Sequence, residues 1–206
     1  MAQESLLPLF PLDLVLLPGE VLPLHIFEMR YRKMISKCHS DGSEFGIVLK
    51  SGDELERIGC AARVREITER FDDGRFNVQV IGSRRFFVRA FDKSEEYLQG
   101  AVDYFSDETP EQASASEVEA MLALGDEVRR LTGSKSSRWD PNHPWLSFKV
   151  AAALPVSKDL KQQLLRTVSE VDRVELVTVF LQAMITMRQR RQRREQLARG
   201  NGRMRQ

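Results

Sequence analysis

The residues that could do chemistry are few and lie far apart in the sequence. The three histidines are His25, His39 and His143, and the two cysteines are Cys38 and Cys60. Neither a GxSxG nucleophile elbow nor an HExxH helix occurs, and the cysteines lack the spacing of a zinc site. On a helix, adjacent Cys38 and His39 would point about 100° apart and could not act as a nucleophile and its base. The sequence therefore predicts no catalytic residue, no metal site and no cofactor.

The segment 133–136, Gly-Ser-Lys-Ser, comes nearest to a phosphate-binding loop. Such a loop needs a Gly-Lys-Ser/Thr triplet with another glycine five positions upstream, so that backbone N–H groups converge on the phosphates. Here a serine separates the glycine from the lysine, and Val128 occupies the upstream position. We interpret the segment as a loop without a nucleotide-binding role.

Candidate binding residues occur where a strand is expected to meet a helix. His25, Glu28 and Arg30 could present hydrogen-bonding groups to a peptide at this junction. Glu28 and Arg30 could instead fix the junction through ion pairs or helix caps. Both interpretations stay open at the level of sequence.

The run 84–87, Arg-Arg-Phe-Phe, interleaves cations with aromatic rings. Arg84 and Phe86 could grip acidic and aromatic peptide side chains, or stack on nucleic-acid bases. In a strand Arg85 and Phe87 face the opposite side, so one phenylalanine is expected in the core in either case.

Trp139 and Trp145 flank a proline-containing loop, residues 140–144. These large aromatic side chains could cover the seam between the two halves of the chain. Alternatively they could form the wall of a binding groove, because pockets often form at domain boundaries.

The C-terminal end is strongly basic. Residues 188–206 hold eight arginines against one acid, a local charge of +7, so the net charge of +1 leaves −6 on the rest of the chain. These arginines could neutralise phosphates of a nucleic acid. The absence of aromatic residues and the glycines instead favour a solvated helix end followed by a disordered tail. The candidate contacts are Arg188, Arg190, Arg191, Arg193 and Arg194.

The elements that position these residues follow two periodicities. Up to about residue 105 short apolar runs alternate with polar residues, which is typical of an antiparallel barrel or sandwich. One helix interrupts them, with Tyr31, Met34, Ile35 and Cys38 at helical spacing. After residue 109 the period becomes helical. We predict an α+β protein with an antiparallel β subdomain at 1–108, a helical bundle at 109–195 and a basic disordered tail at 196–206.

Composition and the first residues of the chain bear on its expected location in the cell. The start of the chain has no basic n-region, and the apolar run 6–24 is broken by Asp13 and four prolines. The sequence therefore predicts neither a signal peptide nor a membrane span. Two cysteines without a disulfide pattern favour a cytoplasmic protein.

Segments spread over most of the chain resemble the N-terminal domain of the ATP-dependent Lon protease. The opening, 7–34, is similar to the start of that domain almost throughout. The resemblance covers roughly residues 6–187. The other matching segments are 45–49, 58–62, 73–77, 82–86, 97–102, 145–147, 154–156 and 161–165, followed by Arg173.

This resemblance implies a six-stranded PUA-like barrel with one accessory helix, followed by a helical bundle. It also implies binding of unfolded or tagged polypeptides, in connection with a protease or chaperone system, and it is compatible with an oligomer. The chain ends at Gln206 without the ATPase and peptidase modules of Lon. We therefore expect a non-catalytic, stand-alone polypeptide-binding module, with nucleic-acid binding as the alternative.

Overall fold

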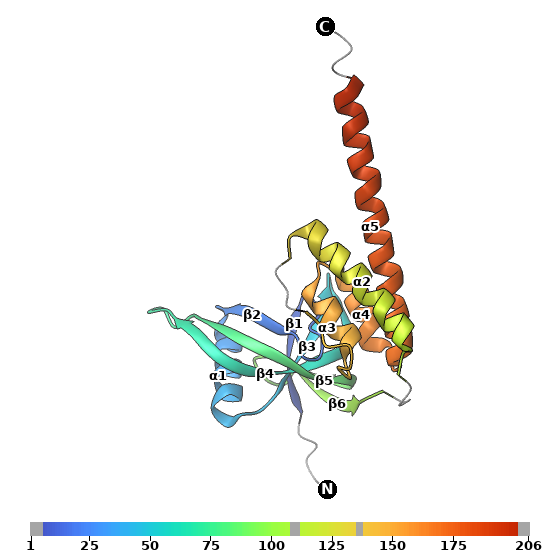
Figure 1. Cartoon of the computed structure of the whole chain (residues 1–206). Helices are drawn as coiled ribbons and strands as arrows, with labels where there is room; N and C mark the ends of the chain where they lie inside the picture. Colours follow the sequence, from blue (N-terminus) through green and yellow to red (C-terminus); the bar gives the residue numbers. More distant parts are fainter. Residues whose placement is uncertain (1–5, 108–111, 135–137, 202–206) are drawn as a thin grey trace. The chain divides into compact units, whose positions relative to one another are not determined.

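The computed structural model describes residues 6–107, 112–134 and 138–201, with side chains described up to Arg194. Within these residues the fold is α+β, with six strands and five helices (Figure 1). The strands are β1 (Leu7–Leu12), β2 (Val21–Ile26), β3 (Phe45–Ser51), β4 (Glu54–Arg70), β5 (Phe76–Asp92) and β6 (Gln99–Phe105). The helices are α1 (Met29–Asp41), α2 (Ala115–Thr132), α3 (Leu146–Ala153), α4 (Lys158–Arg166) and α5 (Glu170–Asn201).

The chain forms two compact units. The sheet unit comprises residues 1–110 and 155–169, and the helical unit comprises residues 111–154 and 170–206. The segment with α4 therefore packs with the strands, although it lies between two helices of the helical unit in the sequence. The apolar periodicity from which we predicted the boundary at 108 and 109 contains no signal for this return of the chain.

The strands form one mixed sheet in the order β2-β5-β4-β3-β1-β6, and β6 also pairs with β5. This last pairing closes β5, β4, β3, β1 and β6 into a ring. All pairs are antiparallel except β1 with β3, where Leu9 pairs with Gly46 and Leu12 with Leu49. The expectation of a purely antiparallel barrel was wrong for this one pair, since β1 and β3 are joined by β2 and α1 instead of by a tight hairpin.

Strand β5 is continuous from Phe76 to Asp92 and contains Gly82 and Ser83 in its interior. Its alternating Phe76, Val78 and Val80 are all buried. Gly82 lies inside the strand. A Cβ at this position would come within 2.2 Å of the Leu17 carbonyl oxygen, which explains why the residue is a glycine. The glycine therefore allows a close backbone approach and does not break the strand.

Helix α1 packs with the apolar face predicted from its spacing. Tyr31, Met34, Ile35 and Cys38 are all buried, and the helix ends at Gly42 in the left-handed conformation. The N–H of Gly42 donates to the Cys38 carbonyl, which satisfies one of the last free carbonyls of the helix. Residues 29–41 are thereby held against the strands.

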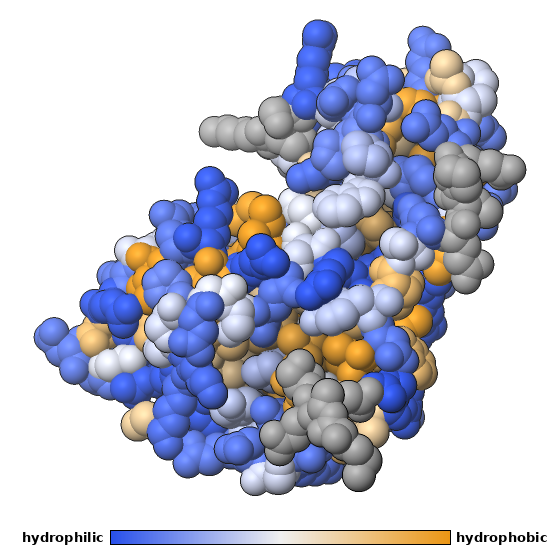
Figure 2. Space-filling view, turned by 90° about the horizontal axis from the view of Figure 1, so that it is seen from below, coloured by the Kyte–Doolittle hydropathy of each residue, from blue (hydrophilic) through white to orange (hydrophobic). Residues whose placement is uncertain are grey.

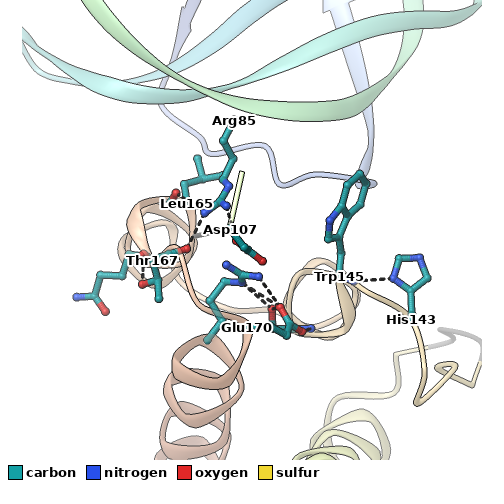
Figure 3. Close-up of polar contacts among 10 residues, drawn as sticks. Arg85, Asp107, His143, Trp145, Leu165, Thr167 and Glu170 are labelled. Carbon is teal, nitrogen blue, oxygen red and sulfur yellow. Dashed lines mark hydrogen bonds and ion pairs between the residues drawn. The ribbon is translucent and has the colours of Figure 1, made fainter. Parts of the chain in front are cut away.

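A buried arginine joins β5 to the end of α4 within the sheet unit (Figure 3). Arg85 donates to the carbonyl oxygens of Leu165 (3.2 Å) and Thr167 (2.6 Å) and forms an ion pair with Asp107 at 2.5 Å. The amide of Gln162 donates to the Ile58 carbonyl of β4 at 3.0 Å. These contacts explain why the segment with α4 belongs to the sheet unit.

The helical unit is held by a second buried arginine. The carboxylate of Glu170 accepts from the backbone N–H and the hydroxyl of Ser147, which lies in the first turn of α3. Arg173, fully buried, donates to the same carboxylate at 2.6 Å and lies over the Phe148 ring. A carboxylate at a helix N-terminus is favourable because free N–H groups converge there. The start of α5 thus fixes the start of α3.

Helix α5 continues to Asn201, so helix extends into the region where we expected a disordered tail from residue 196. Residues 202–206 of that predicted tail lie outside the described residues. Within the described part of the chain, no helix combines the length and apolarity needed to cross a membrane.

Candidate functional site

The predicted residues at the strand-helix junction line a hollow of about 660 Å³ in the sheet unit, which we call the β2 hollow. His25 ends β2, Glu28 precedes α1 and Arg30 lies in its first turn. Apolar side chains of Phe10, Leu24, Ile26, Phe27, Leu55 and Leu98 form much of its lining. The β2–α1 junction therefore brings His25, Glu28 and Arg30 to one place, as the sequence suggested.

The polar groups of the junction remain accessible. Arg30 forms an ion pair with Glu28 at 2.7 Å, and both side chains are almost half exposed. The side chain of Glu28 makes no cap hydrogen bond to α1. An exposed ion pair contributes only about 0–1 kcal/mol, so little stability is lost when either group turns to a ligand.

A short hydrogen-bonded chain fixes the His25 ring. Its Nδ1 lies 2.7 Å from the side-chain oxygen of Asn77, whose amide nitrogen donates to Glu69 at 2.8 Å. Since Asn77 presents its oxygen, Nδ1 carries the hydrogen and donates. The ring also stacks on Phe27 at 6.0 Å between centroids and meets the edge of Phe71 at 5.7 Å. His25 is therefore held through Nδ1, and its Nε2 takes no part in these hydrogen bonds.

Two exposed apolar side chains at the same junction were missed in the sequence. Phe27 is 60% exposed and Met29 is 58% exposed. At 100° per residue Met29 lies opposite the buried stripe of α1, which is the signal that could have identified it. Figure 2 shows one face of the molecule, on which apolar residues, in orange, lie among largely hydrophilic ones, in blue.

Arg84 lies in a different hollow of the sheet unit, about 630 Å³, which we call the Glu44 hollow. Glu44 accepts hydrogen bonds from Ser83, Arg63 and Arg84, at 2.8, 3.1 and 2.9 Å. The guanidinium of Arg84 lies 3.6 Å above the ring of Tyr104. The two hollows share Tyr97 in their linings.

Glu44 and Arg84, which both line the Glu44 hollow, already satisfy each other. Burial alone would raise the pKa of Glu44, but hydrogen bonds from Ser83 and Arg84 outweigh it and hold this pKa below its usual value. Burial would likewise lower the pKa of Arg84, yet its bonds to Glu44 raise it. Arg84 is therefore already paired with Glu44 within the fold.

Phe86 does not belong to any binding surface, because its side chain is fully buried in the core of the sheet unit. It packs with Leu9, Val48, Ala61 and Val88. Phe87, the next residue, is 40% exposed, so one phenylalanine of the pair is in the core as predicted. Phe86 is thus removed from the predicted peptide contacts.

The two tryptophans belong to the helical unit and differ in exposure. Trp139 packs closely on Gly125 of α2 and lies 5.5 Å from the guanidinium of Arg129. Trp145 is 41% exposed, and its backbone N–H donates to Nδ1 of His143 (Figure 3). Trp139 therefore acts as a packing residue of this unit, and Trp145 alone keeps a large accessible face.

The predicted nucleic-acid contacts are exposed along α5. They are Arg188, Arg190, Arg191, Arg193 and Arg194. At 100° per residue these five positions are spread around most of the helix circumference instead of forming one stripe. A single nucleic-acid backbone could contact only part of the set at a time.

The thiols and the titratable clusters give no reactive centre in the described residues. Burial raises the pKa of both the Cys38 and the Cys60 thiol, which opposes formation of a nucleophilic thiolate. No three His, Cys, Asp or Glu side chains converge as metal ligands in the part of the chain that the structure describes. The notable chemistry of the described surface is therefore hydrogen bonding and apolar contact.

Comparison with known proteins identifies relatives of this architecture. The Lon N-terminal domain protein from Xanthomonas campestris superposes with a TM-score of 0.68 at 25% identity, covering 85% of this chain and 98% of that one. The N-terminal domain of the Mycobacterium avium complex Lon protease gives 0.61 at 20% identity, covering 86% and 98%. The second likeness shows the fold alone.

The chain is also similar to parts of longer proteins. The Lon protease of Flavobacterium johnsoniae is 29% identical over 61% of this chain and 16% of its own length. The Lon protease of Brevibacillus choshinensis is 26% identical over 85% of this chain and 24% of its own length. This chain therefore spans less than a quarter of these relatives.

Residues 6–183 match the profile of the ATP-dependent protease La (LON) substrate-binding domain. This match covers most of the chain, and it agrees with the mixed six-stranded sheet and the helices of the structure. The chain belongs to the LON substrate-binding domain family.

Proposed function

We propose that this protein is a non-catalytic polypeptide-binding module that recognises unfolded or tagged polypeptides through the β2 hollow. The observation that carries the proposal is the exposure of Phe27 and Met29 beside a hollow with an apolar lining. Exposed apolar surface next to a concave site favours capture of apolar side chains from a partner. Membership of a substrate-binding domain family supports the same function.

The chemistry of the hollow fits a polypeptide better than a single small polar molecule. The apolar part of the lining can take a partner side chain, and both signs of charge are offered by Lys50, Lys93, Glu95 and Glu96. His25, Glu28 and Arg30 add hydrogen-bonding groups at the junction. A lining that mixes apolar side chains with charges of both signs suits varied polypeptide sequences, because no single charge pattern is required.

The proposal is tested by measuring binding of fluorescently labelled, reduced and carboxymethylated α-lactalbumin, which cannot refold. We expect Phe27→Ala to weaken binding about tenfold, since a phenylalanine side chain contributes about 1.5–3 kcal/mol when fully buried. Phe87→Ala is the matched control, because Phe87 is an exposed phenylalanine of the sheet unit outside the β2 hollow. Equal affinities of the two variants, or no binding by the unaltered protein, would contradict the proposal.

A second candidate function is nucleic-acid binding, favoured by the five exposed arginines of α5. Neutralised phosphates release counterions, so the affinity for a single-stranded RNA would fall steeply with salt. Deletion of residues 188–206 would abolish this binding and leave α-lactalbumin binding unchanged. Tight, salt-sensitive RNA binding by a protein that ignores unfolded α-lactalbumin would reverse the order of the two candidates.

A further inference from the structure

The sheet unit carries a three-stranded arm with two edges of different character. The arm consists of β2, the first part of β5 (76–82) and the second part of β4 (63–70). β2 ends the strand order and pairs only with β5 among the described strands. On the other side, the pairing of β4 with β3 ends at Ala62, so 63–70 forms the opposite edge.

The β4 edge has the features by which proteins block strand addition. Its register against β5 shifts twice, between Val64 and Glu66 and between Ile67 and Glu69. Bulges and edge charges prevent a further strand from pairing. Five of its eight residues are charged: Arg63, Arg65, Glu66, Glu69 and Arg70.

The β2 edge lacks both of these features. Its register against β5 runs without a shift from Val21 opposite Ile81 to Ile26 opposite Phe76. Its sequence, Val-Leu-Pro-Leu-His-Ile, contains no Asp, Glu, Lys or Arg. Val21, Pro23 and His25 are exposed, while Leu22 and Leu24 are half-buried. Pro23 leaves one gap in its outward N–H groups, but the rest of this regular, apolar edge is a template for another strand.

The register shows which backbone groups face outward. Gly82 donates its N–H to the Glu20 carbonyl, and in an antiparallel pair such hydrogen-bonded positions alternate. The residues that point toward β5 are therefore Leu22, Leu24 and Ile26. The N–H and C=O groups of the alternate residues, 21, 23 and 25, point away from β5. Pro23 agrees with this assignment, since it has no N–H to give to β5.

We propose that the outer edge of β2 binds an extended segment of an unfolded polypeptide as an added β-strand. The outward groups supply two N–H donors, from Val21 and His25, and three carbonyl acceptors. The β2 hollow begins at the end of the same strand, because Leu24, His25 and Ile26 line it. A segment paired with β2 would then place an apolar side chain near that hollow. This inference rests on the proposed function and specifies how the polypeptide is held.

A second copy of this chain fits the edge less well than a foreign segment. Two β2 strands related by a two-fold axis would pair antiparallel with Pro23 opposite Pro23, at the centre of the outward positions. Both central residues lack an N–H, so the middle of the ladder would be unbonded. An unrelated segment can place its own donors opposite the Pro23 carbonyl.

The test compares three variants of β2 in binding to reduced, carboxymethylated α-lactalbumin. Val21→Pro removes one outward N–H and should weaken binding about three- to tenfold, as expected for one lost hydrogen bond. Val21→Ala keeps this N–H and is the matched control, expected to bind within about twofold of the unaltered protein. Pro23→Ala adds an outward N–H and should tighten binding about threefold. Thermal unfolding of each variant checks the fold.

Amide hydrogen exchange on the full chain provides a second readout that needs no variant. Addition of unfolded α-lactalbumin should slow exchange at Val21 and His25, whose N–H groups point outward. Binding without slower exchange, or equal affinities of Val21→Pro and Val21→Ala, would overturn strand addition and leave the proposed function intact. Loss of all binding by the unaltered protein would overturn both. Concentration-dependent dimers that Val21→Pro abolishes would identify a second copy as the occupant and overturn the inference.

Discussion

The two hollows of the sheet unit have similar volumes but differ in how far the paired carboxylate of each is exposed to solvent, 8% for Glu44 and 41% for Glu28. In the Glu44 hollow one carboxylate accepts from Ser83, Arg63 and Arg84. In the β2 hollow the Glu28–Arg30 pair is exposed, and so is most of the surface of Phe27, which lines the hollow, and of Met29 at the same junction. The first arrangement stabilises the fold, and the second leaves interactions available to a partner.

The comparison predicts the largest stability change at Glu44. We expect Glu44→Gln to lower the free energy of unfolding by about 2 kcal/mol, because charge-assisted hydrogen bonds are weakened. Affinity for unfolded α-lactalbumin should stay within about twofold. The measurement is urea unfolding of the full chain. Glu96→Gln is the matched control, since Glu96 forms an exposed ion pair with Lys33 and should cost less than about 1 kcal/mol.

The free energy of unfolding, measured as a function of pH, tests the contribution of the same Glu44 carboxylate. The pKa of Glu44 is lowered in the folded state, so its stabilisation is complete above its unfolded pKa of about 4.3 and is lost as pH falls through the folded value. The unaltered protein should therefore lose more stability than Glu44→Gln below about pH 4.3. Parallel stability curves for the two proteins would show that Glu44 is not preferentially stabilised as a carboxylate.

At the β2 hollow we expect substitutions to leave stability nearly unchanged and to weaken polypeptide binding. Phe27→Ala and Met29→Ala should change the free energy of unfolding by less than about 0.5 kcal/mol, because both side chains are more than half exposed. Chemical unfolding measures this, alongside the affinity loss expected for Phe27→Ala. A stability loss as large as that of Glu44→Gln would place Phe27 in the fold's packing and remove the contrast between the hollows.

The smallest expected effect is the change of α-lactalbumin affinity with salt concentration. Apolar contacts and backbone hydrogen bonds are only weakly screened, so α-lactalbumin affinity should change less than about threefold between 50 and 300 mM NaCl. Titrations at several salt concentrations check this prediction. A steep loss of affinity with salt would instead indicate that the charged side chains of the β2 hollow, or the arginines of α5, provide the binding energy.

Much of the fold follows from short-range patterns in the sequence. The spacing of Tyr31, Met34, Ile35 and Cys38 predicted both α1 and its buried face, and the alternation of short apolar runs predicted that the chain up to about residue 105 is rich in strands. The burial of Arg85 could not be predicted in this way. It depends on Leu165 and Thr167, some 80 residues later, which return to cover that face of β5.

The candidate site was only partly predictable for the same reason. His25, Glu28 and Arg30 are neighbours in sequence, so the junction could be recognised before the structure was known. Arg84 appeared equally available, but its partner Glu44 comes from a segment 40 residues away. Whether an exposed charge is free or already paired depends on such long-range contacts.

Mapping the bound surface by NMR tests the central claim most directly. Unfolded α-lactalbumin is added to the ¹⁵N-labelled full chain, and the amide shifts of both hollows are followed. The account predicts shifts at residues 24–28, with little change at Glu44, Ser83 and Arg84. Shifts confined to the Glu44 hollow or to α5, with residues 24–28 unchanged, would contradict the assignment of polypeptide binding to the β2 hollow.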